Sequence, residues 1–168
     1  MAHFFIFYTR LRTEEKLLFR AAEDKGIPFS AVNLSDGLWP NVPGEAGDVA
    51  LCRCVSQTQN SALAVLLEAR GVLTVNSSGV MGLCADKIVT AAKLSAAGIP
   101  QPEYAVAFSP EGAAEGAERL GYPLVIKPAT GSWGRLLAKV NDRDALEAVA
   151  EHKAHMGAAH SVLFMQQY

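Results

Sequence analysis

The first 75 residues alternate short apolar runs with segments that carry helix start and stop signals, and this alternation constrains the fold most. Four apolar or β-branched runs predict strands, at residues 4–8, 28–34, 48–53 and 72–75. Thr13 and Ser56 are suitable N-cap residues for helices over residues 14–25 and 56–71. Such alternation implies right-handed crossovers and a parallel sheet, so residues 1–75 are expected to form a Rossmann-like domain.

The turn after the first of these strands differs from that of dinucleotide-binding domains. Residues 8–13 contain no Gly-x-Gly-x-x-Gly pattern. Those glycines let the backbone approach a pyrophosphate closely. Dinucleotide binding at this turn is therefore not expected, and residues 35–47, which lack periodicity, are expected to form a surface loop.

A second informative stretch, residues 121–140, is typical of a strand, a glycine-rich turn and a further strand. Residues 124–126 form a short apolar run, as in a buried strand. Lys127 follows at the end of this run, where it loses solvation and needs an anionic or hydrogen-bonding partner. Gly131 and Gly134 leave a bare backbone that can approach a ligand closely.

This stretch is not a Walker A loop, because it lacks the Gly-Lys-Ser/Thr ending and a strand rather than a helix follows. A hairpin flap that covers phosphates fits the lysine and the glycines. An ordinary hairpin, whose glycines serve only the turn geometry, fits the pattern as well. The residue pattern alone leaves both interpretations open.

The remaining segments predict a helical connection over residues 76–100 and a small α+β lobe over residues 101–168. Asp86 is suited to N-cap a helix that reaches to about Ala97. Lys87 in its first turn is unexpected, because cations are disfavoured near a helix N-terminus unless an anion is present, so the residues alone leave open a solvated lysine or a lysine beside a bound anion. In the lobe, strands are expected at residues 105–108, 124–126, 136–140 and 161–167, and helices at residues 110–120 and 142–156.

Two strings carry a resemblance to a known family, VIKP at residues 125–128 and GSWGRLLAKV at residues 131–140. They resemble the phosphate-covering hairpin of ATP-grasp ligases, and more narrowly that of the LysX-type ligases. Enzymes of this type join α-aminoadipate, or glutamate in arginine biosynthesis, to the terminal glutamate of a small acidic amino-group carrier protein. Asn76 and Ser77 with Asp86 and Lys87 are similar to the family segment whose lysine contacts the nucleotide phosphates.

The resemblance implies an ATP site. Lys87 and Lys127 would hold the phosphates from two sides as point charges. Gln166 and Gln167 would lie at the hinge that holds adenine, where related enzymes usually have Gln-Glu-Tyr, so any carboxylate role at position 167 would be lost. The implied nucleotide-binding residues are Lys87, Lys127, Gly131, Ser132, Trp133, Gly134, Arg135, Gln166 and Gln167.

The implied fold is α/β, a Rossmann-like pre-ATP-grasp domain followed by the N-terminal α+β lobe of an ATP-grasp fold. The resemblance covers only the front part of the family's enzymes. The magnesium ligands and the amino-acid pocket would lie in the rest, so no catalytic or metal-binding residue is assigned here. We therefore expect a truncated ligase that uses ATP and Mg²⁺ when complete and that is inactive as this chain alone.

Arg53 also lies in a segment similar to the family, at a strand-to-helix turn. It could hold a substrate carboxylate, or it could be a surface arginine at a strand end. Cys52 and Cys54 fall on one face of a strand and are better explained as small buried residues than as zinc ligands. Three further residues on one helix face are expected to be solvated rather than metal-bound: Glu151, His152 and His155.

The composition of the chain argues against some classes of binding partner. A net charge of −2 argues against non-specific nucleic-acid binding, which needs a basic face. The chain shows no signal peptide and no apolar stretch that could span a membrane, and its three cysteines suggest free thiols in a reducing cytoplasm. Two other possibilities stay open, a glutamate ligase that acts on a ribosomal protein or peptide, and a non-catalytic nucleotide-binding or homo-oligomeric module.

Overall fold

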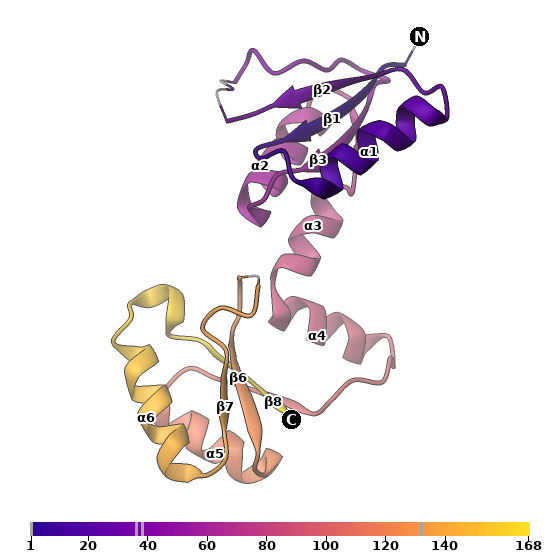
Figure 1. Ribbon diagram of the computed structural model, residues 1–168. Helices are drawn as coiled ribbons and strands as arrows, with labels where there is room; N and C mark the ends of the chain where they lie inside the picture. Colours follow the sequence, from indigo (N-terminus) through magenta and orange to yellow (C-terminus); the bar gives the residue numbers. More distant parts are fainter. Residues whose placement is uncertain (1, 36, 38, 132) are drawn as a thin grey trace. The chain divides into compact units, whose positions relative to one another are not determined.

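The computed structural model describes residues 2–35, 37, 39–131 and 133–168, and the chain divides into two compact units, Met1–Gly82 and Leu83–Tyr168 (Figure 1). Each unit has its own sheet and its own hydrophobic core. The finer division into segments 1–75, 76–100 and 101–168 stays a prediction. Every described helix is too short or too polar to cross a lipid bilayer.

The first unit contains the parallel sheet that the alternation predicts. Its strands are β1 (Phe4–Tyr8), β2 (Phe29–Asn33), β3 (Val49–Arg53) and β4 (Leu73–Val75). They lie in the order β2-β1-β3-β4, and every pair is parallel. Residue Phe4 of β1 is in register with Phe29 on one side and with Val49 on the other. The Rossmann-like prediction for this unit is confirmed.

The sheet of the first unit is covered on both faces, by α1 (Thr13–Asp24) and α2 (Gln57–Glu68). Alternate side chains of β1 explain this arrangement, because successive residues of a strand point to opposite faces. Phe5 and Phe7 belong to the core that contains Leu67 of α2. On the other face, the ring of Tyr8 lies 5.8 Å from the ring of Phe19 in α1.

Helix boundaries in the first unit differ from the prediction in two places. Arg12, not Thr13, is the N-cap of α1, because the carboxylate of Glu15 accepts a hydrogen bond of 3.1 Å from the Arg12 backbone N–H. Ser56 is the N-cap of α2 as predicted, although the helix ends at Glu68 rather than near residue 71.

A third helix, α3 (Ser78–Ala85), lies within the helical connection predicted over residues 76–100, although no separate helix was assigned there. Its start is stabilised from outside the segment, because the carboxylate of Glu68 accepts a hydrogen bond of 2.7 Å from the Ser78 backbone N–H. The side-chain hydroxyls of Thr74 and Ser78 also donate to this carboxylate. Ser77 is also a local cap, because its hydroxyl oxygen accepts a hydrogen bond of 3.3 Å from the Val80 backbone N–H.

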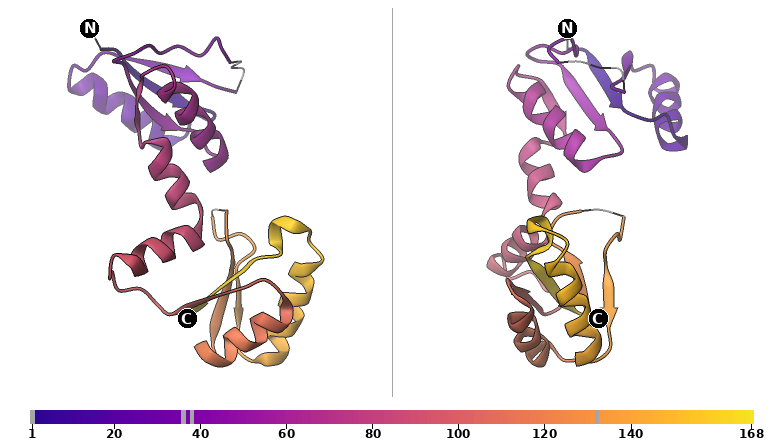
Figure 2. Two further views of the ribbon diagram at one scale, coloured as in Figure 1. Left: turned by 180° about the vertical axis from the view of Figure 1, so that it is seen from behind. Right: turned by 90° about the vertical axis from the view of Figure 1, so that its left-hand side faces the viewer.

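The second unit contains an antiparallel sheet and α4 (Lys87–Ala96), which is N-capped by Asp86 as predicted. The strands, in spatial order, are β5 (Tyr104–Ala107), β8 (Leu163–Gln167), β6 (Leu124–Pro128) and β7 (Ala138–Val140). Two helices, α5 (Pro110–Leu120) and α6 (Arg143–Ala154), share one core with this sheet (Figure 2). The core side chains of β6, Leu124 and Ile126, alternate along the strand, so both helices cover the same face.

The α+β prediction for the second unit is confirmed, with shifts at several element ends and one short helix that was not predicted. β7 begins at Ala138 rather than at residue 136, because Leu136 has a φ of 59° and cannot continue a strand. β8 begins at Leu163 rather than at residue 161. A short 3₁₀ helix, η1 (Ala158–His160), precedes β8 and was not predicted.

Candidate functional site

Lys127 lies near the end of β6, between β8 and β7. Its Nζ donates a hydrogen bond of 2.5 Å to Oε1 of Gln166 on β8. The antiparallel register, which pairs Val125 with Gln166, brings the two side chains together. The hydrogen-bonding partner that a half-buried lysine requires is therefore a neutral amide.

Lys87, the first residue of α4, lies against the loop that follows β6. Its backbone N–H donates to the carbonyl of Ala129 at 2.8 Å, and its Nζ donates to the carbonyl of Gly131 at 3.1 Å. Asp86 and Thr130 form an isolated antiparallel bridge at the same place. The start of α4 is thus attached by backbone bonds to the loop that Lys127 precedes.

The two lysines are close enough to affect each other. Burial lowers the pKa of Lys87 most, the positive charge of Lys127 lowers it further, and the charge of Asp86 opposes both effects. Within the described part of the chain, neither ammonium group has an ion pair. Two neighbouring ammonium groups without a carboxylate partner favour the binding of a multiply charged anion.

The glycine-rich turn after β6 has the backbone conformation that glycine favours. Gly131 and Gly134 have φ values of 121° and 63°. Trp133, with a φ of 65°, is 70% exposed, and Arg135 is also exposed. Ser132 lies outside the described residues. These glycines serve the turn geometry, and the exposed turn is also compatible with a flap, so both interpretations of the sequence still apply.

The predicted adenine hinge lies at the end of β8. Gln166 is half-buried and bonded to Lys127, whereas the Gln167 side chain is exposed. The Gln167 backbone N–H donates to the carbonyl of Glu103 at 2.9 Å. An adenine contact for either residue stays a prediction.

Arg53, in the first unit, lies at the end of β3 as expected and is bound to an acidic residue that the sequence analysis missed. Its Nη2 lies 3.1 Å from Oε1 of Glu15, and the same oxygen lies 2.8 Å from Nη2 of Arg12. Glu15 is fully buried, and the hydrogen bond from Arg12 is the main cause that lowers its pKa to about 2. The three-residue spacing of Arg12 and Glu15 at a helix start was the available signal. Because Arg53 is 35% exposed, contact with a substrate carboxylate stays a prediction.

Two cysteines lie where the sequence predicts, as small buried residues of the core. Cys52 and Cys54 are buried in the core of the first unit, and burial raises the pKa of Cys52 to about 12. Glu151 and His152 on α6 and His155, the C-cap of this helix, are exposed, as expected for a solvated face. The described residues contain no group of three or more histidine, cysteine, aspartate or glutamate side chains that could hold a metal ion.

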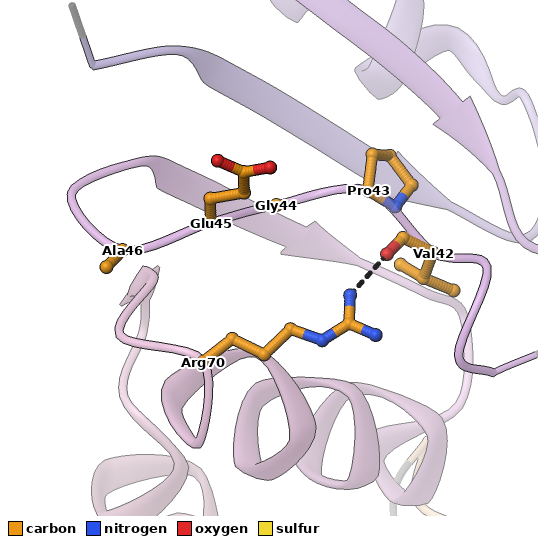
Figure 3. Close-up of a pocket in the computed structure, with 6 residues that line it drawn as sticks. All are labelled: Val42, Pro43, Gly44, Glu45, Ala46 and Arg70. Atoms are coloured by element: carbon orange, nitrogen blue, oxygen red, sulfur yellow. Dashed lines mark hydrogen bonds between the residues drawn. The ribbon is translucent and has the colours of Figure 1, made fainter.

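A surface pocket of about 550 Å³ lies beside the 35–47 loop in the first unit (Figure 3). Its lining residues are Val42, Pro43, Gly44, Glu45, Ala46 and Arg70. Both terminal nitrogens of Arg70 donate to loop carbonyls, at 2.7 Å to Val42 and 2.7 Å to Pro40, and its guanidinium lies 3.8 Å from the Trp39 ring centroid. Arg70 thus stabilises the loop through one hydrogen bond from each of its terminal nitrogens.

Comparison with known proteins shows similarity to LysX-type ligases. Residues 4–83 match the LysX preATP-grasp domain family. The chain is 38% identical over 160 residues to the glutamate–LysW ligase ArgX of Sulfurisphaera tokodaii, a match that covers 94% of this chain and 57% of that protein. It is 34% identical over 155 residues to the α-aminoadipate–LysW ligase LysX of the same organism, covering 89% and 54%.

Among solved structures, the RimK-domain ATP-grasp protein of Sphaerobacter thermophilus superposes with a TM-score of 0.82 at 32% identity. The match covers 99% of this chain and 64% of that one. The chain therefore spans little more than half the length of the curated relatives that it matches.

Proposed function

Because residues 4–83 match the LysX preATP-grasp domain family, we propose that this chain forms part of the ATP site of a carboxylate–amine ligase. The observation that carries the proposal is the proximity of two lysines: Lys87, which is bonded to the loop after β6, and Lys127, which lies near the end of β6 and lowers the pKa of Lys87. The two ammonium groups, without an ion pair among the described residues, fit an unneutralised triphosphate.

In this proposal the chain orients the nucleotide and supplies no nucleophile. Lys87 and Lys127 screen the phosphate charge, and residues 131–135 cover the phosphates. Gln166 and Gln167 border the adenine, and Arg53 holds a substrate carboxylate. Mg²⁺, when bound, would supply positive charge that neutralises the phosphates, and we assign it no ligand among the described residues.

The proposed reaction has two steps. A substrate carboxylate oxygen forms a bond to the γ-phosphorus of ATP while the bond to the leaving ADP breaks, which gives an acylphosphate. The amine of an amino acid then attacks the acyl carbon, phosphate leaves, and the amine loses a proton. Lys87 and Lys127 act by stabilising charge on the phosphate oxygens in both steps.

The proposed substrates follow the names of the relatives. The carboxylate would be the terminal glutamate of a small acidic carrier protein, and the amine would come from glutamate or α-aminoadipate, in arginine or lysine biosynthesis in the cytoplasm. The 38% and 34% identities to ArgX and LysX support both amino acids. A second candidate is a ligase that adds glutamate to a ribosomal protein or peptide, and the similarity to a RimK-domain ATP-grasp protein is compatible with either ligase.

Calorimetric titration with MgATP tests the site in this chain. Lys127→Ala should weaken binding by about 1–3 kcal/mol, the range for a hydrogen bond that involves a charged group. Lys93→Ala is the matched control, because Lys93 is exposed at the other end of α4. Equal affinities for all three proteins would contradict the proposed role of Lys127.

The reaction is tested with the complete product of the source reading frame. It is incubated with ATP, Mg²⁺, the carrier protein and each amino acid in turn, and the mass of the carrier is measured. A mass increase with one amino acid identifies the amine substrate. An unchanged carrier together with a modified ribosomal protein or peptide would favour the second candidate.

A further inference from the structure

One lysine occupies a core position. Lys153 is 5% exposed on α6, at the spacing that places Leu146 and Ala150 in the core of the second unit. Lysine is seldom buried without a partner, because its ammonium group loses hydration. An apolar side chain would fill this position at lower cost, so the amine requires its own explanation.

The amine of Lys153 is directed to the glycine-rich loop. Its Nζ donates a hydrogen bond of 2.8 Å to the carbonyl of Leu136, seventeen residues earlier in the chain. The described residues provide no carboxylate within ion-pair distance. Burial lowers the pKa of Lys153, as expected for an ammonium group without a counter-charge.

The bonded carbonyl belongs to a residue in an unfavourable backbone conformation. Leu136 has a φ of 59°, in the left-handed region that residues other than glycine rarely adopt, and its side chain is 47% exposed. An exposed side chain contributes little packing to hold that conformation. The bond from the buried Lys153 therefore fixes the loop at this point.

The other side of the same loop is also held by a lysine. Nζ of Lys87 donates to the carbonyl of Gly131 at 3.1 Å. Lys87 is half-buried and is the residue that we assign to the phosphates, so an arriving anion would compete for its ammonium group. Lys153, a buried residue of α6, should keep its bond to the Leu136 carbonyl whether or not an anion is bound.

We propose that Lys153 is a positioning residue that anchors the distal end of the glycine-rich loop, so that the loop closes over the phosphates from a fixed base. The bond from Lys153 to the loop does not depend on a ligand. That the anchored loop closes over phosphates rests on the proposed function of the site.

Limited proteolysis of the 168-residue chain by trypsin tests the anchor without nucleotide. Arg135 lies next to the anchored residue and is exposed, so the 135–136 bond reports on the loop. Lys153→Met keeps the length of the side chain and removes the donor. We expect cleavage after Arg135 to become about tenfold faster, the change that one lost hydrogen bond from a charged donor produces.

Two controls separate anchoring from a general effect on stability. Cleavage after Lys25, an exposed residue at the end of α1 in the first unit, should be unchanged, and His152→Ala on the exposed face of α6 should behave as the wild type. The melting temperature of Lys153→Met should not fall, because methionine suits a buried position.

Lys153→Arg, which retains a donor, should restore slow cleavage after Arg135. Unchanged cleavage after Arg135, or an equal increase at both sites, would overturn the proposal.

A measurement on the wild type covers the case in which the methionine variant fails to fold. Reductive methylation should modify the exposed Lys139 at least tenfold faster than Lys153. Equal rates would overturn the proposal.

Addition of MgATP separates the anchor from the proposed function. In the wild type, bound ATP should protect the bond after Arg135 from trypsin. If the methionine variant is cleaved faster while ATP protects neither protein, the anchor is supported and the nucleotide site is refuted. In the complete enzyme, Lys153→Met should raise KM for ATP more than it lowers kcat.

Discussion

The buried carboxylate of Glu15 gives the clearest test of the first unit, because two arginines depend on it. Its pKa is lowered from 4.5 to about 2, and the Glu15 side chain is fully buried. Each pH unit between these values corresponds to about 1.4 kcal/mol. The ionised carboxylate therefore contributes roughly 3 kcal/mol to the free energy of unfolding at neutral pH. Glu15→Gln should remove most of this contribution, since breaking a buried ion pair costs about 3–5 kcal/mol.

Urea denaturation at pH 7, followed by tryptophan fluorescence, measures this loss. In a Trp133→Phe background the signal comes from Trp39, which lies in the first unit beside Arg70. Glu14→Gln is the matched control: it removes the same charge from the same helix turn, but at a side chain that is 61% exposed. The control should change the free energy of unfolding by less than about 1 kcal/mol.

The pH dependence provides an independent check. The pKa of Glu15 is lower in the folded than in the unfolded protein, so its stabilisation is complete above about pH 4.5 and is lost as the pH falls toward about 2. The difference in stability between wild type and Glu15→Gln should shrink across this range. A constant difference, or equal stability of both proteins at pH 7, would refute the reasoning.

Three further predictions follow from the described contacts. Arg70→Ala should lower the free energy of unfolding of the first unit by about 1–3 kcal/mol in urea denaturation, because two bonds to loop carbonyls are lost. In the folded protein, iodoacetamide should modify the exposed Cys84 before the buried Cys52 and Cys54, and mass spectrometry would show equal labelling if burial does not protect them. Since the pKa of Lys87 is lowered, its share of ATP affinity should decline as the pH rises, earlier than for an ordinary lysine, and calorimetry across alkaline pH should show that Lys87→Gln removes this decline.

Local signals in the sequence predicted most elements of both units. The apolar runs predicted every described strand, and polar N-cap residues predicted helix starts at Asp86 and Ser56. α3 has a local cap signal in Ser77, which was not used, and a non-local bond to the carboxylate of Glu68 in the preceding helix, which the sequence does not show. The predicted start of β7 at residue 136 was wrong. Leu136 has a left-handed backbone conformation that nothing in the sequence indicates.

The candidate site was predictable in its residue types and not in its bonds. A lysine at the end of a buried strand predicted a need for a partner at Lys127, and the structure supplies Gln166 from a strand far along the chain. The attachment of Lys87 to the loop after β6 depends on the tertiary arrangement of α4 within the second unit. Such contacts join residues more than thirty positions apart, which periodicity and capping rules do not address.

The hydrogen bond from Lys127 to the side-chain amide of Gln166 affects how strongly the lysine would attract an anion. Gln166 keeps the ammonium group oriented without cancelling its charge. A carboxylate at the same place would form an ion pair, and an incoming phosphate would then have to compete with a charge of its own sign. With a neutral acceptor, the lysine is already aimed and retains its full attraction for the arriving ligand. The resting bond therefore prepares the site for an anion instead of substituting for one.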